Sequence, residues 1–117
     1  MRGTRRDEGA QAEALAARFL ADNGLAIIDR NWRHRSGELD LVARDGDALV
    51  FVEVRLRSNA NFGGPAASIT AAKRARMVAA AGHYIAALPR TPSCRFDAVL
   101  LDSLDPARIE WLKNIVD

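Results

Sequence analysis

Apolar and polar residues alternate with two different periods along the chain, and the change of period separates expected helices from expected strands. From Gly9 to Asn23 apolar residues recur at helical spacing, and Gly24 is a typical helix stop. A second helical pattern begins after Ser68 or Thr70, either of which can cap it, and continues to about Leu88. The positions expected to face inward are Ala12, Leu15, Ala16, Phe19 and Leu20 in the first helix and Ile69, Met77, Ala80, Ala81, Tyr84 and Ile85 in the second.

Strict alternation of apolar and polar residues predicts two longer strands, at residues 37–44 and 48–57, around a hairpin turn at Asp45-Gly46-Asp47. Apolar segments at residues 26–31, 94–101 and 109–112 predict three more strands. The glycine- and asparagine-rich stretch after the hairpin, SNANFGGP, predicts a loop. The resulting order α-β-β-β-α-β-β indicates an α/β fold in which helices flank a mixed β-sheet.

The predicted hairpin carries its charged residues on one face, because side chains alternate between faces along a strand. A two-residue turn at Gly46-Asp47 pairs Asp40 with Glu53 and Glu38 with Arg55. A turn one residue earlier shifts the pairing by two residues and leaves all four groups on the same face. Only an odd slip would separate them, and such a slip would bury charge. The shared face is therefore expected with either turn.

Two carboxylates that face each other across a hairpin repel and destabilise the pair. They can instead share a hard divalent cation such as Mg²⁺ or Mn²⁺, which would activate a water and polarise a phosphodiester. This makes Asp40 and Glu53 candidate catalytic residues, with Arg55 on the same face to stabilise developing charge. The alternative is a row of solvated ion pairs in which Glu38 and Asp40 pair with Arg55 and Arg57, each pair contributing less than about 1 kcal/mol.

Length and composition fit a single globular domain. We expect a flexible basic arm over residues 1–8 and one domain over residues 9–117, since 117 residues suffice for only one hydrophobic core. The first residues lack the apolar segment of a signal peptide, and no apolar run approaches the roughly 20 residues that span a bilayer. The single cysteine, Cys94, is expected in the core and forms no internal disulfide. We therefore expect a cytoplasmic protein with no membrane partner.

Basic residues are the expected contacts with nucleic acid. Of the 17 basic residues 15 are arginine, whose planar guanidinium binds phosphate as a fork. Basic residues in the first turns of the second helix can position DNA or RNA near the hairpin, or can form a solvated helix face. Phe62 can stack on an unpaired base or pack onto the domain. The nucleic-acid-binding candidates are Arg33, Arg35, Arg57, Phe62, Lys73, Arg74 and Arg76.

Three further residues have expected roles outside the hairpin. Asp97 is expected to pair with a nearby arginine, either Arg95 or Arg33. His34, in the polar segment before the hairpin, is a weaker candidate for a phosphate contact. His83 lies in the middle of the second predicted helix and is expected at the surface.

The sequence resembles a known family over nearly all of its length. The segments GAQAEALAARFL, NWRHRSGELD, GELDLVARDGDALVFVEVRLR, FGGPAASITAAKRARM, AAGHYIAAL and CRFDAVLLD are similar, in the same order, to the YraN-like family of small bacterial proteins. That family is similar to archaeal Holliday-junction resolvases. The resemblance implies a restriction-endonuclease-like fold and the PD-(D/E)xK nuclease motif.

The resemblance also implies a role for each motif position. Asp40 would be the motif aspartate, Glu53 the second carboxylate, and Arg55 stands where the motif lysine would be. Glu13 matches the helix glutamate that completes the metal site in resolvases, so Glu13, Asp40 and Glu53 would bind Mg²⁺ or Mn²⁺. Arginine in place of lysine is a departure, because arginine keeps its charge and is a poor proton shuttle.

Three functions are consistent with these residues. The first is a Mg²⁺- or Mn²⁺-dependent endonuclease that acts on branched or structured DNA. The second, motivated by Arg55, is a nucleic-acid-binding module with impaired catalysis. The third is a protein-interaction subunit. Resolvase-like proteins act as two-fold dimers because a four-way junction has matching symmetry, so a homodimer is also considered.

Overall fold

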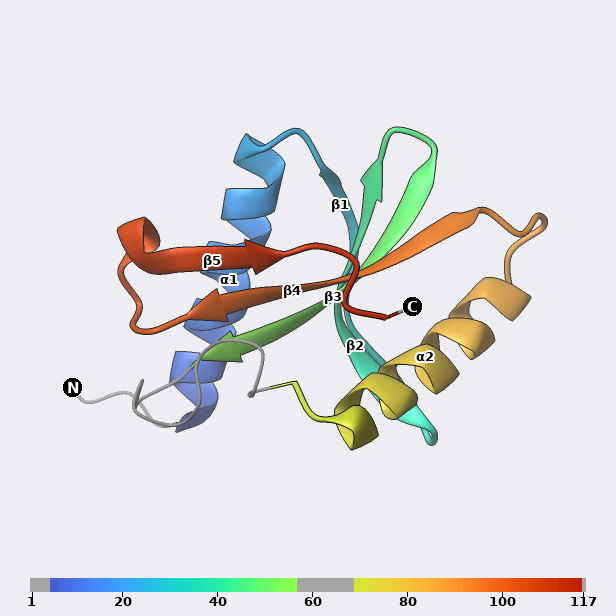
Figure 1. Cartoon of the computed structure of the whole chain (residues 1–117), viewed down its shortest axis with the longest axis horizontal. Helices are drawn as coiled ribbons and strands as arrows, with labels where there is room; N and C mark the ends of the chain where they lie inside the picture. The colour runs from blue at the N-terminus through green and yellow to red at the C-terminus, as the bar shows by residue number, and fades with distance from the viewer. Residues whose placement is uncertain (1–4, 57–68, 117) are drawn as a thin grey trace.

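The computed structural model of the chain describes residues 5–56 and 69–116, with side chains from Glu8 onward (Figure 1). The observed order of elements, α-β-β-β-α-β-β, is the predicted one, so the α/β class is confirmed. Neither described helix is long and apolar enough to cross a membrane. The elements are α1 (Arg5–Asp22), β1 (Ala26–His34), β2 (Gly37–Asp45), β3 (Ala48–Leu56), α2 (Ala71–Ala86), β4 (Ser93–Leu101), the 3-10 turn η2 (Pro106–Arg108) and β5 (Ile109–Leu112).

One mixed β-sheet with the strand order β1-β2-β3-β4-β5 forms the centre of the molecule. Strands β1, β2 and β3 pair antiparallel, β3 and β4 pair parallel, and β4 and β5 pair antiparallel. Helix α2 lies in the connection between β3 and β4, where a parallel pair requires a crossover. Figure 1 shows α1 on one side of the sheet and α2 on the other.

Each helix covers its own hydrophobic cluster. Helix α1 packs Ala16 and Leu20 against the face of the sheet that carries Leu41 and Val52. Helix α2 packs onto the opposite face, which carries Phe51. The alternation along β2 and β3 therefore fills two cores, and each fully buried large apolar side chain contributes about 1.5–3 kcal/mol. Every residue predicted to face inward lies in one of the clusters, namely Ala12, Leu15, Ala16, Phe19, Leu20, Ile69, Met77, Ala80, Ala81, Tyr84 and Ile85.

The hairpin has the first of the two predicted turns. Asp45 pairs with Ala48 and Leu41 pairs with Val52, so the two-residue turn is Gly46-Asp47. Gly46 has a φ of 60°, a conformation that glycine adopts without steric cost. In this register Asp40 and Glu53 are the next pair of opposed positions after Leu41 and Val52.

The buried carboxylate of Asp97 forms hydrogen bonds that join β5 and the residues after it to β4. Asp97 is fully buried and accepts hydrogen bonds of 2.9 Å from both Nε and Nη2 of Arg95, which is one of its two predicted partners. It also accepts from the indole nitrogen of Trp111 and the backbone N–H of Asn114, each at 3.0 Å. Arg95 in turn contacts Asp45 of the hairpin at 3.1 Å. The network thus joins β4, β5 and the hairpin.

Three details differ from the sequence-based expectation. Helix α1 begins at Arg5 and not at Gly9, because the charged residues before Gly9 are compatible with a helix and continue it. Strand β1 continues to His34, where it still pairs with Gly37 of β2. Cys94 is exposed, because it lies in the first residues of β4, before the strand enters the core.

Candidate active site

The backbone pairing of β2 with β3 stops short of the strand ends, and a cleft lies at that point. The last pair in the register is Leu41 with Val52. One step further along, the backbone N–H of Val54 donates a hydrogen bond of 2.8 Å to Oδ2 of Asp40. The side chain of Asp40 therefore takes the place of a backbone acceptor, which fixes its carboxyl group between the two strands.

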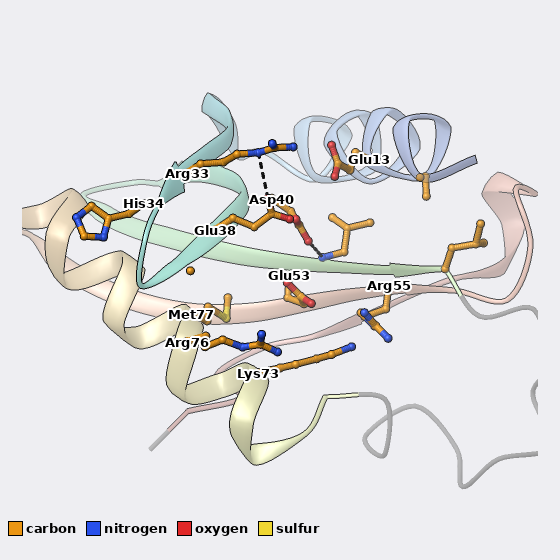
Figure 2. A pocket seen from close by; sticks show the side chains of 15 residues that line it. Glu13, Arg33, His34, Glu38, Asp40, Glu53, Arg55, Lys73, Arg76 and Met77 are labelled. Carbon is orange, nitrogen blue, oxygen red and sulfur yellow. Dashed lines mark hydrogen bonds and ion pairs between the residues drawn. The ribbon is translucent and has the colours of Figure 1, made fainter. Parts of the chain in front are cut away.

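The cleft has a volume of about 590 Å³ and is lined by both helices and by the first three strands. Figure 2 shows Asp40 and Glu53 in its centre, with Glu13 approaching from α1 and Lys73 and Arg76 from α2. The hairpin thus brings its charged face to a place that two helices enclose. The charged residues that line the cleft are Glu13, Arg33, Glu38, Asp40, Glu53, Arg55, Lys73 and Arg76.

Asp40 and Glu53 lie side by side in the cleft and form an acid pair. Asp40 is only 7% exposed, and burial together with the charge of Glu53 raises its pKa from 3.8 to about 8. A hydrogen bond with the side chain of Glu53 raises this pKa further, whereas the N–H of Val54 lowers it. At neutral pH the pair therefore holds a proton. A divalent cation could replace that proton, and an all-oxygen carboxylate pair is the kind of site that Mg²⁺ and Mn²⁺ prefer.

Glu13 adds a third negative group to the cleft. Its pKa is raised by partial burial and by the charge of Asp40, and it is lowered by a hydrogen bond from Asn31. Within residues 5–56 and 69–116, no three acidic, histidine or cysteine side chains come close enough to form a ready-made metal cluster. The residues present fit a cation held mainly by Asp40 and Glu53, with Glu13 beside them.

Lys73 and Arg55 lie next to this acid pair, and neither forms an ion pair with another residue in the part of the chain that the structure describes. Lys73 lies in the first turn of α2, where Thr70 caps the helix by accepting a hydrogen bond of 3.2 Å from the backbone N–H of Lys73. Its pKa is lowered by partial burial and by the charge of Arg55, and raised by the charge of Glu53. The Nε of Arg55 is buried and has no hydrogen-bond partner among the residues that the structure describes. Like charges with an unsatisfied donor make a binding place for an anion.

The predicted ion pair of Glu38 with Arg55 is not formed, and the predicted pair of Asp40 with Arg57 falls on a residue outside the described part of the chain. Glu38 forms an ion pair of 3.3 Å with Arg33 on the neighbouring strand β1, and both side chains are largely exposed. Such an exposed pair contributes less than about 1 kcal/mol. Arg55 instead extends into the cleft (Figure 2). Within the described residues, Asp40 forms no ion pair with an arginine.

Four of the predicted nucleic-acid contacts lie outside the cleft or outside the described residues. Arg35 is exposed in the turn between β1 and β2 and does not line the cleft. Arg74 does not line the cleft, and its buried Nε has no hydrogen-bond partner among the described residues. Arg57 and Phe62, with the loop predicted after the hairpin, lie outside the residues that the structure describes.

His34 and His83, which are far apart in the sequence, stack on one another at the edge of the cleft. Their ring centroids lie 3.7 Å apart with an angle of 17° between the planes. The Nδ1 of His34 accepts a hydrogen bond of 3.2 Å from the N–H of Ser36. Partial burial and the neighbouring His83 lower the pKa of His34. The sequence placed His34 near the hairpin but gave no signal for the stack, which depends on the docking of α2.

Two other residues at the site were missed. Asn31 has a φ of 52°, which is uncommon for a residue other than glycine. Gly37 lies so close to α2 that a Cβ would be 2.6 Å from the backbone oxygen of Arg76. The glycine of the GEL segment is visible in the sequence, but its close contact with α2 follows only from how that helix packs on the sheet.

Comparison with known proteins gives a consistent result over almost the whole chain. The profile of Uncharacterised protein family UPF0102 matches residues 12–101. A UPF0102 protein of Nitrosospira multiformis is 51% identical over 114 residues, which cover 97% of this chain and 96% of that protein. A UPF0102 protein of Nitrosomonas europaea is 48% identical over 111 residues, covering 95% and 94%. A relative from Cupriavidus taiwanensis is 53% identical over 115 residues, covering 97% and 86%.

Proposed function

The chain belongs to the UPF0102 family, and we propose that it is a metal-dependent endonuclease acting on branched or structured DNA. The observation that carries this proposal is the pair of buried Asp40 and half-buried Glu53 beside the cations Arg55 and Lys73, which form no ion pair within residues 5–56 and 69–116. A buried carboxylate pair that must hold a proton makes the folded protein less stable as the pH rises, so it does not benefit the fold itself. It is a suitable place for a cation, and the adjoining cations suit a phosphate.

The chemistry follows from where each side chain lies. Asp40 and Glu53 would hold the cation after Asp40 has lost its proton, and the N–H of Val54 keeps Asp40 in place. A bound Mg²⁺ or Mn²⁺ would supply Lewis acidity and lower the pKa of a water. Arg55 and Lys73 hold the non-bridging oxygens of the phosphate and stabilise its developing negative charge. Arg55 itself does not exchange a proton, because a guanidinium stays charged.

The choice of substrate rests on fold and resemblance. The order of elements agrees with the restriction-endonuclease-like arrangement that the sequence resemblance implies. Asp40, Glu53 and Arg55 stand at the motif positions, with arginine in place of lysine. Holliday-junction resolvases, which the resemblance also points to, cut branched DNA. We therefore expect branched substrates to be cut in preference to plain duplex, and we expect a homodimer that matches the symmetry of a four-way junction.

Purified protein should cut a panel of four-way junctions, flaps and single strands in the presence of Mn²⁺. Asp40→Ala should abolish cutting, because it removes a cation ligand and frees the N–H of Val54. Asp47→Ala is the matched control, since Asp47 is exposed in the hairpin turn and does not line the cleft. Cutting that survives Asp40→Ala would come from a contaminant and would contradict the proposal.

Arg55 favours one alternative, a module that binds nucleic acid without cutting it. Its buried and unpaired Nε suits phosphate binding whether or not hydrolysis follows. This alternative predicts DNA binding that weakens steeply with salt, and no cleavage with any divalent metal. Cleavage gained by Arg55→Lys, in a chain that otherwise only binds, would favour the alternative.

A further inference from the structure

Two imidazole rings form a flat stack at one end of the cleft. His34, on β1, lines the cleft, and the ring of His83, on α2, lies 3.7 Å from it with 17° between the planes. The indole of Trp32 is nearly parallel to the ring of His34, with 7° between the planes and 6.0 Å between the centroids. His83 is exposed, and within residues 5–56 and 69–116 it contacts no other ring. His83 therefore keeps surface on which a further flat ring can stack.

The ring of His34 is held in one orientation by the turn that follows it. Its Nδ1 accepts a hydrogen bond of 3.2 Å from the backbone N–H of Ser36 and lies 2.9 Å from the hydroxyl of the same residue. A ring nitrogen that accepts from a backbone N–H carries no proton, so His34 is neutral in this arrangement. A neutral ring suits stacking better than it suits an ion pair with phosphate. The stack is thus oriented before any ligand arrives.

A purely structural stack would serve to fill the gap between β1 and α2. That gap is already filled by Trp32 and Tyr84, whose rings meet edge to face with their centroids 5.3 Å apart. Tyr84 also packs edge to face on the buried ring of Phe51. His83 precedes Tyr84 on the helix but is exposed. The packing of α2 on the sheet therefore does not require an aromatic ring at position 83.

The stack is in line with the cations that α2 brings to the cleft. Arg76 follows Lys73 by three residues and His83 follows Arg76 by seven, a spacing that places all three along one face of the helix. A rise of about 1.5 Å per residue puts His83 about 10 Å beyond Arg76 along the helix axis. Figure 2 shows Lys73, Arg76 and His34 in this order along α2. Stacked nucleotides of one strand advance by about 3.4 Å each, so the distance from Arg76 to His83 spans about three of them.

We propose that His83, supported by His34, is a stacking platform for an unpaired base of a DNA strand whose phosphates lie on Lys73 and Arg76. The inference rests on the proposed function and narrows its substrate to DNA with at least one unpaired base near the cleft. A base inside a duplex has both faces covered by its neighbours, so only a splayed or single-stranded base can present a face to His83. Every base has such a face, so no preference for sequence is expected.

The test measures the binding of a single strand and of a flap substrate in a metal chelator, so that it depends on neither cation binding nor cutting. An abasic site is moved along the unpaired strand, which removes one base at a time and keeps every phosphate. Wild type should lose affinity by about 5-fold or more at one position of the abasic site. His83→Ala should lose a similar factor with the intact strand and should no longer respond to an abasic site at that position.

The chemistry of position 83 separates stacking from other contacts. His83→Phe should keep the wild-type affinity and its response to the abasic site, because a phenyl ring stacks but carries no charge. His83→Gln, which is polar but has no ring, should behave as His83→Ala does. Val78→Ala is the matched control, because Val78 is also exposed on α2 and lies outside the cleft lining. The variants should melt near the temperature of wild type, since position 83 is exposed.

The possible failures of this test are distinct. Wild-type affinity in His83→Ala, or no loss at any position of the abasic site in wild type, would overturn the platform and leave the proposed function standing. A His83→Ala variant that keeps the response to the abasic site, while its logarithmic salt dependence falls by about one unit, would reveal a phosphate contact and overturn stacking. Wild-type protein that binds none of these strands at low salt would overturn the proposed function and the platform together.

Discussion

The backbone N–H of Val54 donates a hydrogen bond of 2.8 Å to Oδ2 of Asp40, at the point where the backbone pairing of β2 with β3 has ended. This contact commits one carboxylate oxygen to the fold and leaves the other available. It also holds the side chain in a buried place beside Glu53, where a negative charge is unfavourable. The burial that suits Asp40 to bind a cation therefore also lowers the stability of the metal-free protein when Asp40 is ionised, and this loss can be measured.

Asp40 should make the metal-free protein less stable as the pH rises. Its pKa is 3.8 ordinarily and about 8 in the folded chain. Between these values the folded chain holds a proton that the unfolded chain lacks, so unfolding releases a proton and becomes easier with rising pH. The stabilising contribution is complete below about pH 4 and is lost as the pH passes through about 8. Urea denaturation in a metal chelator should show this decline.

Asp40→Asn should remove most of that pH dependence. The amide oxygen can still accept from Val54, and the amide needs no proton to remain neutral beside Glu53. At pH 8 the free energy of unfolding should therefore be higher for Asp40→Asn than for wild type, and the difference should shrink as the pH falls. Asp47→Asn, at an exposed position in the turn, should leave the pH profile unchanged. A profile that is the same for wild type and Asp40→Asn would contradict the assignment of the proton to Asp40.

Gly37→Ala should destabilise the protein and weaken DNA binding. The added Cβ would lie 2.6 Å from the backbone oxygen of Arg76, so α2 must move away from β2. Overpacking of this kind costs about 1–3 kcal/mol, and the movement displaces Lys73 and Arg76 together. Gly82→Ala, on the same helix with nothing within 4 Å, should instead stabilise by about 0.5–1 kcal/mol. Equal melting temperatures for the two variants would rule out the close packing.

Asp97→Asn should be strongly destabilising without a direct effect on the cleft. The substitution removes the buried negative charge that faces Arg95, whose guanidinium would keep only one anionic partner, Asp45. Breaking a buried ion pair in this way costs about 3 kcal/mol or more. Asp45→Asn, at a side chain that is 41% exposed, should cost less than about 1 kcal/mol. Denaturant unfolding of the two variants should therefore give clearly different midpoints.

Lys73 should contribute to DNA affinity through its charge. Lys73→Met removes one cation from the cleft, so binding of a four-way junction should weaken and its logarithmic salt dependence should fall by about one unit. Lys113 is the only other lysine and lies over the ring of Trp111 at 4.3 Å, outside the cleft lining. Lys113→Met should leave the slope unchanged. The same slope for Lys73→Met and wild type would exclude a phosphate contact at Lys73.

The hairpin and its charged face were predictable because they depend on local parity. Side chains alternate with a period of two, so Asp40 and Glu53 had to share a face once Asp45-Gly46-Asp47 formed the turn. The inward faces of the helices were predictable for a similar reason, since period 3.6 fixes which residues point together. The register that the structure adopts is one of the two that the turn allowed.

The remaining features depend on how the elements dock. Alternation could not reveal that α1 and α2 enclose the charged face, so the burial of Asp40 was not foreseen. The contact of Gly37 with Arg76 and the stack of His34 on His83 join segments that are distant in the sequence. The left-handed φ of Asn31 arises within a strand where the residue pattern is ordinary. Such features depend on how the elements pack together, and the residue pattern of a single element does not predict that packing.

The central claim is that the acid pair binds a divalent cation, and it is tested most directly by calorimetric titration of Mn²⁺ into wild type and Asp40→Ala. Wild type should bind one Mn²⁺ per chain, more tightly at pH 8 than at pH 6, because the cation must displace the proton that Asp40 holds. Asp40→Ala should show no binding at this site. Equal Mn²⁺ affinity in the two proteins, or no binding by wild type at either pH, would contradict the claim.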